Sequence, residues 1–152
     1  MPIIVANSAD FSGIRRIWEE QFTTEPDYLN VMFSQIIPLC TNYICKEGDE
    51  ILSVASFMPM HFYDTERNLH LEGYYMFGVA TLTKAQGRKL AVQTILHASN
   101  AIESKGYQFI FERPANQGLN NYYLKLGFTT PITRIHYRFL PHNSIGTLGS
   151  NM

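Results

Sequence analysis

The chain has almost no net charge and few cysteines, and both shortages narrow the functions open to it. Its 12 Lys and Arg residues are balanced by 13 Asp and Glu residues, which gives a formal net charge of −1 at pH 7. A general nucleic-acid binder needs a basic face, so this balance argues against nucleic acid as a partner. The two cysteines, Cys40 and Cys45, lie in apolar stretches. We expect buried thiols rather than a disulfide, which fits a cytoplasmic protein.

Long hydrophobic runs are missing from the sequence. No stretch reaches the ~20 apolar residues that a membrane-spanning helix needs, so no membrane partner is expected. Residues 1–7 carry no basic segment and are expected to form a strand rather than a signal peptide. With 152 residues, of which 45% are hydrophobic, the chain is long enough for one domain with a proper core.

Several common site motifs are missing as well. The sequence contains neither G-x-x-x-x-G-K-[ST] nor G-x-G-x-x-G. Its histidines show no H-x-x-H or H-E-x-x-H spacing, so no metal site is expected. Neither cysteine has a histidine at a telling spacing, which disfavours a thiol nucleophile. The histidines are His61, His70, His97, His136 and His142.

The pattern of apolar residues predicts the element order β-α-α-β-β-β-α-β-α-β. Asp10 and Pro26 are placed to begin the first two helices, and Pro38 ends the second. This order predicts an α/β (α+β) fold, with a mixed sheet packed by helices in one domain of residues 1–140. Residues 141–152 are predicted to form a flexible tail. The predicted strands after the first are Thr41–Lys46, Ile51–Phe62, Leu69–Ala80, Tyr107–Phe111 and Ile132–Leu140, and the later helices follow Gln86–Lys89 and span Gln117–Leu126.

The stretch 78–91 carries the strongest functional signal. It combines the end of an apolar strand, a turn over Gln86–Lys89 and the start of a long amphipathic helix. A helix start has about four unpaired backbone N–H groups and partial positive charge. With basic side chains beside it, this start predicts a seat for a phosphate or pyrophosphate, and therefore a phosphorylated cofactor. On this segment alone, an ordinary turn with solvated basic residues stays open.

A second segment, Arg113–Phe128, joins the first in a family pattern. Asn116 is followed seven residues later by Tyr123, which opens Y-x-x-x-G-F, and Gln86–Ala91 matches [Q/R]-x-x-G-x-[G/A] except at one position. In this order the two motifs resemble the GNAT superfamily of N-acyltransferases, and the resemblance covers residues 3–140 in element order. The exception is Lys89, which replaces a glycine that lets the backbone approach the phosphates closely.

The resemblance implies a single-domain, mostly antiparallel sheet flanked by helices, and transfer of an acetyl group from acetyl-CoA to an amine. It implies that strand amides polarise the thioester carbonyl, that the loop holds the pyrophosphate, and that Asn116 contacts the cofactor from the opposite wall. Tyr123 would be the general acid that protonates the leaving thiolate. The cofactor-binding residues implied in this way are Val79, Ala80, Thr81, Gln86, Gly87, Arg88, Lys89, Leu90, Ala91 and Asn116.

The general base and the acceptor stay open. Counting back from Gln86 along the preceding strand, Tyr75 takes the position at which some family members have a glutamate. Glu72 lies on the same predicted strand, and Glu112 lies at the end of the next one. A water chain or an amine that arrives neutral are alternatives, and Tyr123 could be a core residue. The acceptor could be a small-molecule or a peptide amine. Candidates for its cleft are Tyr28, Phe33, Phe62 and Tyr63.

Two further alternatives concern the whole chain. The substituted glycine and the unnamed base leave room for a non-catalytic domain of the same fold that binds acyl-CoA or a partner protein. One predicted strand, Ile132–Leu140, follows Phe128, where family members have two. The sheet edge left open by the missing strand predicts a possible homodimer.

Overall fold

The computed structural model describes residues 2–130, which fall into two compact units that meet between Glu112 and Arg113. The predicted strand Ile132–Leu140, the predicted tail 141–152 and the sheet edge expected to pair in a homodimer lie outside the described residues. None of the described helices has the length and apolar character needed to cross a membrane.

A five-stranded sheet forms the centre of the first unit. Its strands are β1 (Ile3–Val5), β2 (Thr41–Glu47), β3 (Glu50–Asp64), β4 (Leu69–Thr81) and β5 (Phe109–Glu112). They lie in the order β1-β2-β3-β4-β5, and every pair is antiparallel except β4 with β5. Tight hairpins join β2, β3 and β4, whereas the parallel pair needs a helical crossover. The predicted mixed, mostly antiparallel sheet flanked by helices is confirmed.

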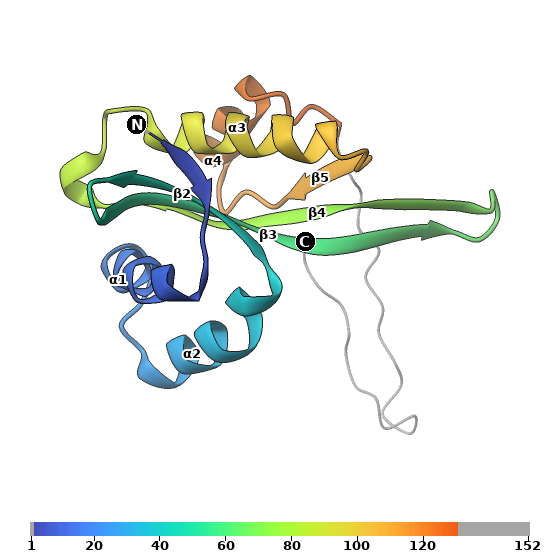
Figure 1. The fold of residues 1–152 in the computed structure, drawn as a ribbon. Helices are drawn as coiled ribbons and strands as arrows, with labels where there is room; N and C mark the ends of the chain where they lie inside the picture. The colour runs from blue at the N-terminus through green and yellow to red at the C-terminus, as the bar shows by residue number, and fades with distance from the viewer. Residues whose placement is uncertain (1, 131–152) are drawn as a thin grey trace. The chain divides into compact units, whose positions relative to one another are not determined.

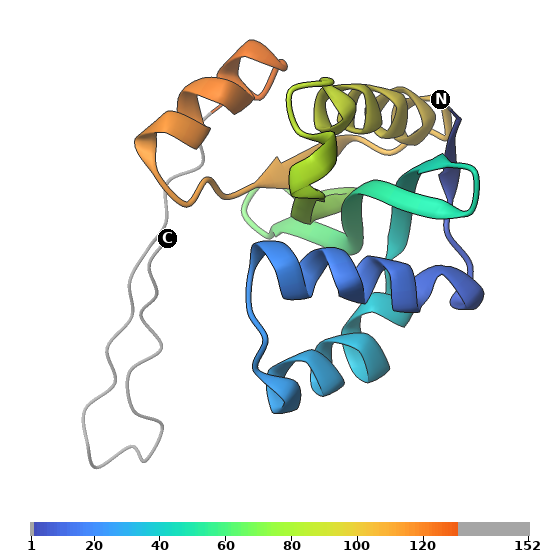
Figure 2. The same cartoon turned by 90° about the vertical axis from the view of Figure 1, so that its left-hand side faces the viewer.

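Helices cover both faces of this sheet (Figures 1 and 2). Helices α1 (Phe11–Gln21) and α2 (Pro26–Val31) lie on one face, and α3 (Leu90–Ser104), the crossover helix, lies on the other. α2 continues as a π turn and a 3-10 turn to Leu39. On the sheet-facing sides of these helices Ile17 and Thr94 are buried, whereas Phe22 is exposed and Ala91 is half-buried.

Asp10 does not cap α1 as predicted. The cap belongs to the preceding 3-10 turn, where Asn7 Oδ1 accepts the Ala9 N–H at 2.9 Å and Asp10 Oδ2 accepts the Asn7 N–H at 3.0 Å. The second Asp10 oxygen lies 2.6 Å from Lys46 Nζ on β2. The bond to Lys46, with the Asn7 N–H, lowers the pKa of Asp10 below its usual value. The residue therefore ties the chain's first turn to the sheet.

A bulge in β4 fits the strand against α1. Val54 lies opposite Ala80, but Ser56 lies opposite Phe77, so β4 carries one more residue than β3 in this interval. Gly78 sits in the bulge at φ +61°, and a Cβ there would lie 2.8 Å from Trp18 Cζ2. Both the left-handed backbone and the indole contact require glycine.

Replacing Gly78 by alanine tests this contact, with Gly48 as a matched control. Gly48 has φ +62° in the β2–β3 turn, and a Cβ there would meet nothing within 4 Å. Gly48→Ala should lower the free energy of unfolding by about 1 kcal/mol from backbone strain alone. Gly78→Ala should lower it by a further ~1–3 kcal/mol through the clash with Trp18. Urea unfolding measures both, and equal losses would contradict the account.

Candidate functional site

The C-terminal end of β4 runs past its neighbour β5. The parallel pairing covers Gly73–Met76 against Phe109–Glu112, whereas β4 continues to Thr81. Within residues 2–130, no strand pairs with the β5 side of β4 beyond Met76. The two strands therefore part at Met76 and Glu112, just before the bulge at Gly78.

The alternation of hydrogen bonds along β4 shows which amide at the end of this strand faces the gap between β4 and β5. The Leu82 N–H donates to the Leu52 carbonyl at 2.9 Å. In an antiparallel ladder the next residue back, Thr81, then turns its N–H and C=O away from β3, and Ala80 turns its own toward it. The Gln86 side chain donates to the Thr81 carbonyl at 3.3 Å, which agrees with this direction. Among the predicted strand amides, Thr81 is the one that this alternation points away from β3.

The loop after β4 leaves a helix start without a side-chain cap. A 3-10 turn, Thr83–Ala85, precedes two left-handed residues, Gly87 at φ +84° and Lys89 at φ +60°. α3 begins at Leu90, and Lys89 at its N-cap position makes no side-chain cap bond. The first intrahelical donor is the Gln93 N–H, which bonds to the Lys89 carbonyl at 3.1 Å. Among the described residues, the amides of residues 90–92 therefore have no partner and form the first turn of the helix.

Acidic residues of the β2–β3 hairpin lie against the basic side chains of this loop. Arg88 Nη2 donates to Glu47 Oε1 at 3.1 Å, and Lys84 Nζ donates to Glu50 Oε2 at 2.6 Å. Within residues 2–130 the Lys89 side chain has no hydrogen-bond or ion-pair partner, so its ammonium group is available to a ligand. Sequence reasoning missed both glutamates, which lie more than thirty residues before their partners.

The end of α1 also supports the loop. Glu20 Oε1 accepts the Thr83 N–H at 2.6 Å, and this backbone bond is the main reason that the pKa of Glu20 is lowered. Gln21 donates to the Thr83 hydroxyl at 3.0 Å and accepts from the Gln86 side chain at 3.3 Å. These contacts hold the 3-10 turn that precedes the start of α3. No local sequence pattern predicts them.

Glu112 is the acidic residue with the most unusual surroundings near this gap. It ends β5 opposite Met76, and burial raises the pKa of its carboxyl above the ordinary value. Its Oε2 atom is buried and has no hydrogen-bond partner among the described residues. Glu72 is exposed, and Tyr75 stacks on Phe77 and contacts the tilted ring of Phe111, with ring centroids 5.8 and 5.5 Å away.

The second unit carries the other predicted motif on one short helix, α4 (Gln117–Lys125). Asn116 caps it, because its Oδ1 accepts the Leu119 N–H at 2.9 Å. The Tyr123 ring packs edge-on against Tyr122 and Phe128, with centroids 5.3 and 5.8 Å away. The residues of the pattern from Asn116 to Phe128 thus form one local cap, helix and aromatic cluster.

The four aromatic residues predicted for an acceptor cleft fall into two groups. Tyr28 and Phe33 both contact the Trp18 indole, with centroids 6.4 and 5.6 Å away. Phe62 and Tyr63 lie instead toward the far end of the β3–β4 hairpin, where Tyr63 stacks on His70. The first pair contacts the same indole that lies against Gly78, and no such contact is recorded for the second pair among the described residues.

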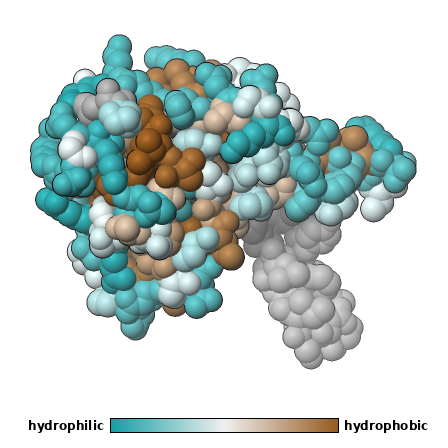
Figure 3. Space-filling model, viewed as in Figure 1, coloured by the Kyte–Doolittle hydropathy of each residue, from teal (hydrophilic) through white to brown (hydrophobic). Residues whose placement is uncertain are grey.

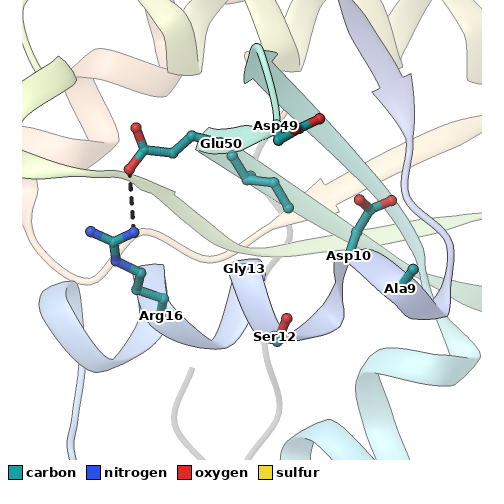
Figure 4. Close-up of a pocket in the computed structure, with 8 residues that line it drawn as sticks. Ala9, Asp10, Ser12, Gly13, Arg16, Asp49 and Glu50 are labelled. Carbon is teal, nitrogen blue, oxygen red and sulfur yellow. Dashed lines mark hydrogen bonds and ion pairs between the residues drawn. The ribbon is translucent and has the colours of Figure 1, made fainter.

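A hollow of about 360 Å³ lies between the start of α1 and the β2–β3 hairpin (Figure 4). The lining side chains of Asp10, Arg16 and Glu50 are already in ion pairs, since Asp10 binds Lys46 and Glu50 binds both Arg16 and Lys84. Paired charges of this kind stabilise the packing of α1 on the hairpin and give no indication of a ligand. The lining residues are Ala9, Asp10, Ser12, Gly13, Arg16, Asp49, Glu50 and Ile51.

Comparisons with solved structures agree on the fold. A GCN5-related N-acetyltransferase from Ralstonia eutropha is similar with a TM-score of 0.70 and 14% identity, over 91% of this chain and 97% of that chain. A predicted acetyltransferase with acetyl-CoA from Clostridium acetobutylicum gives 0.68 and 17%, over 90% and 95%. Glucosamine-6-phosphate N-acetyltransferase from Arabidopsis thaliana gives 0.66 and 12%, over 91% and 97%.

Comparisons of sequence give the family. No curated protein matches the chain. The sequence model of the acetyltransferase (GNAT) family matches residues 11–128, which include the gap in the sheet, the uncapped helix start and α4. The chain belongs to the GNAT acetyltransferase family.

Proposed function

We propose that this protein is an N-acetyltransferase that moves the acetyl group of acetyl-CoA to a small-molecule or peptide amine. The observation that carries the proposal is the uncapped start of α3 directly after the end of β4, which no described strand pairs on its β5 side. Helix-start amides suit a pyrophosphate, and an outward amide such as that of Thr81 suits a thioester carbonyl. The family match and the similarity to an acetyltransferase solved with acetyl-CoA support this donor.

The residues of the loop fit the pyrophosphate of the cofactor. A Cβ at Gly87 would meet nothing within 4 Å, so the space beside the loop is open. Lys89 adopts a left-handed conformation, which a glycine would hold without strain and which costs a lysine about 1–2 kcal/mol. Lysine keeps the backbone N–H, and its ammonium group adds a charge. Residues Gln86–Ala91 would hold the phosphates, with Val79–Thr81 along the acyl arm, and we propose Asn116 as a further cofactor contact.

Three groups of this chain would serve the reaction. Acetyl-CoA would supply the activated acetyl group as a thioester when it is bound. The Thr81 N–H donates to the carbonyl oxygen as negative charge builds on it. Glu112 accepts the proton that the amine must lose, since a carboxyl with a raised pKa is a better base at neutral pH. Tyr123 donates its phenolic proton to the departing thiolate.

Lys89 variants test the cofactor seat. Lys89→Ala should weaken CoA binding by about 1–3 kcal/mol, the usual value of a charge-assisted contact. Lys89→Gly removes the same charge but also the left-handed strain, so it should be about 1 kcal/mol more stable to urea than Lys89→Ala. Lys105→Ala, at the other end of α3, is the control. Calorimetry with CoA that finds equal affinity for Lys89→Ala and Lys105→Ala would rule out the contact.

Tyr123→Phe tests the general acid. The change keeps the ring and its packing but removes the phenolic proton. The Kd for acetyl-CoA should therefore stay unchanged, while kcat falls by about 10²–10⁴. The assay follows CoA release with an amine panel, and the neighbouring Tyr122→Phe is the control. A loss of kcat under threefold would eliminate the role. Binding of acetyl-CoA without any release by the wild type would favour a non-catalytic acyl-CoA-binding domain.

Glu112→Gln tests the base and predicts opposite effects on stability and activity. Burial penalises the charged carboxylate in the folded state, so Glu112 destabilises the fold as pH rises through its ordinary pKa toward the raised one. Glu112→Gln should therefore stabilise the protein at neutral pH and make no difference in acid. It should lower kcat by about 10²–10⁴ and remove the acid limb of the pH–rate profile.

The control for this variant is Glu103→Gln on the exposed face of α3. Urea unfolding at pH 4 and pH 7 and a pH–rate profile measure the two effects. A Glu112→Gln variant that keeps the wild-type rate would show that water, or an amine that arrives neutral, replaces the base.

A further inference from the structure

We propose a site for a divalent transition-metal ion of the zinc class on the β3–β4 hairpin, formed by His61, His70 and Glu72. Their ligand atoms lie within 4.8 Å of one another, and all three side chains are exposed. The metal site does not depend on the proposed acyltransfer chemistry, and the two proposals are tested independently.

The strand register brings the three residues together. His61 lies directly opposite Glu72, and Tyr63 lies opposite His70. Side chains alternate along a strand, so residues 61 and 63 of β3 share one face with residues 70 and 72 of β4. The turn fixes this register, because Asp64 Oδ1 accepts the N–H groups of Glu66 and Arg67, each at 3.1 Å.

The distances suit a shared ion. His61 Nδ1 lies 2.9 Å from His70 Nε2 and 3.8 Å from Glu72 Oε1. Ligands bound to tetrahedral zinc at about 2.0–2.1 Å lie roughly 3.3 Å from each other. Small rotations of these exposed side chains would reach that spacing. Two imidazoles and one carboxylate make a common donor set for zinc, with the fourth position left for water.

Neighbouring groups hold two of the ligands in place. The Tyr63 ring stacks on His70 with centroids 4.5 Å apart and an interplanar angle of 7°. The backbone of Glu72 is tied to Gln108 in both directions, at 3.0 Å from the Glu72 N–H to Gln108 Oε1 and 2.8 Å from the Gln108 N–H to the Glu72 carbonyl. Such supporting contacts orient metal ligands and limit their loss of entropy.

The proton balance is simple. In the His61–His70 hydrogen bond one neutral ring donates an N–H to the bare nitrogen of the other. For both nitrogens to bind an ion, the donating ring shifts its proton to its other nitrogen. The two neutral rings release no proton in this change.

No metal site was expected from the sequence, because the histidines lack the short spacings of helical metal sites. These two histidines are nine residues apart and meet only through hairpin pairing. Their part of the hairpin extends past β5, and its outer end presents mainly hydrophilic residues (Figure 3). An ion in bulk solvent can therefore reach the site.

Calorimetric titration of the tag-free full chain with ZnCl₂ at pH 7.5 tests the proposal. We expect one ion per chain with a Kd on the order of micromolar. His61→Ala and His70→Ala should each weaken binding at least tenfold, and Glu72→Gln should weaken it severalfold. His97→Ala, an exposed histidine of α3, should bind as the wild type does.

A second readout separates this site from zinc bound elsewhere. Zinc should raise the Tm of the wild type and of His97→Ala, because an ion that binds only the folded hairpin stabilises it. It should leave the Tm of His61→Ala/His70→Ala unchanged. No heat at high micromolar zinc, or wild-type affinity in both single histidine variants, would overturn the proposal.

Discussion

The contact between Gly78 and Trp18 sets the geometry of the candidate site. Trp18 is buried in an aromatic cluster with Phe22, Phe33 and Phe77, and its indole lies where a side chain on residue 78 would be. This contact lets α1 pack closely on β4 and holds the bulge in the strand. The bulge lies between the last β5 pairing at Met76 and the outward amide of Thr81, so the direction of that amide depends on it.

The second constraint is charge at the start of α3. The helix start and its basic residues repel one another unless anions lie nearby. Glu47, Glu50 and Glu20 supply these anions in the described structure. An exposed pair such as Arg88 with Glu47 contributes ~1 kcal/mol or less, so a doubly charged pyrophosphate can displace it. The glutamates thus stabilise the loop by itself, and the proposed phosphorylated ligand would take their place beside its basic residues.

Elements with a strong local signal could be predicted from the sequence. The strands β2, β3 and β4, the helix α3 and the helix after Asn116 all follow from turn residues and apolar periodicity within a few residues. The cap that Asn116 forms was not predicted. The two motifs also predicted the family. Features that depend on distant residues could not be predicted: the indole that requires Gly78, the hairpin glutamates beside the loop, and the cross-strand meeting of His61 with His70. The left-handed conformation of Lys89 could not be predicted either, because lysine, unlike glycine, does not indicate a positive φ in the sequence.

Amide chemical-shift mapping during titration with CoA tests the central claim most directly, because the claim is that backbone N–H groups at two separate segments hold one ligand. A ¹⁵N–¹H spectrum of the full chain, followed as CoA and then acetyl-CoA are added, reports every amide at once. The account predicts large shifts for Thr81 and for the amides of residues 87–92, with the β3–β4 turn near Glu66 unchanged. Acetyl-CoA should shift Thr81 further than CoA does. Saturating CoA that leaves residues 87–92 unmoved, or that shifts a different face of the protein, would contradict it.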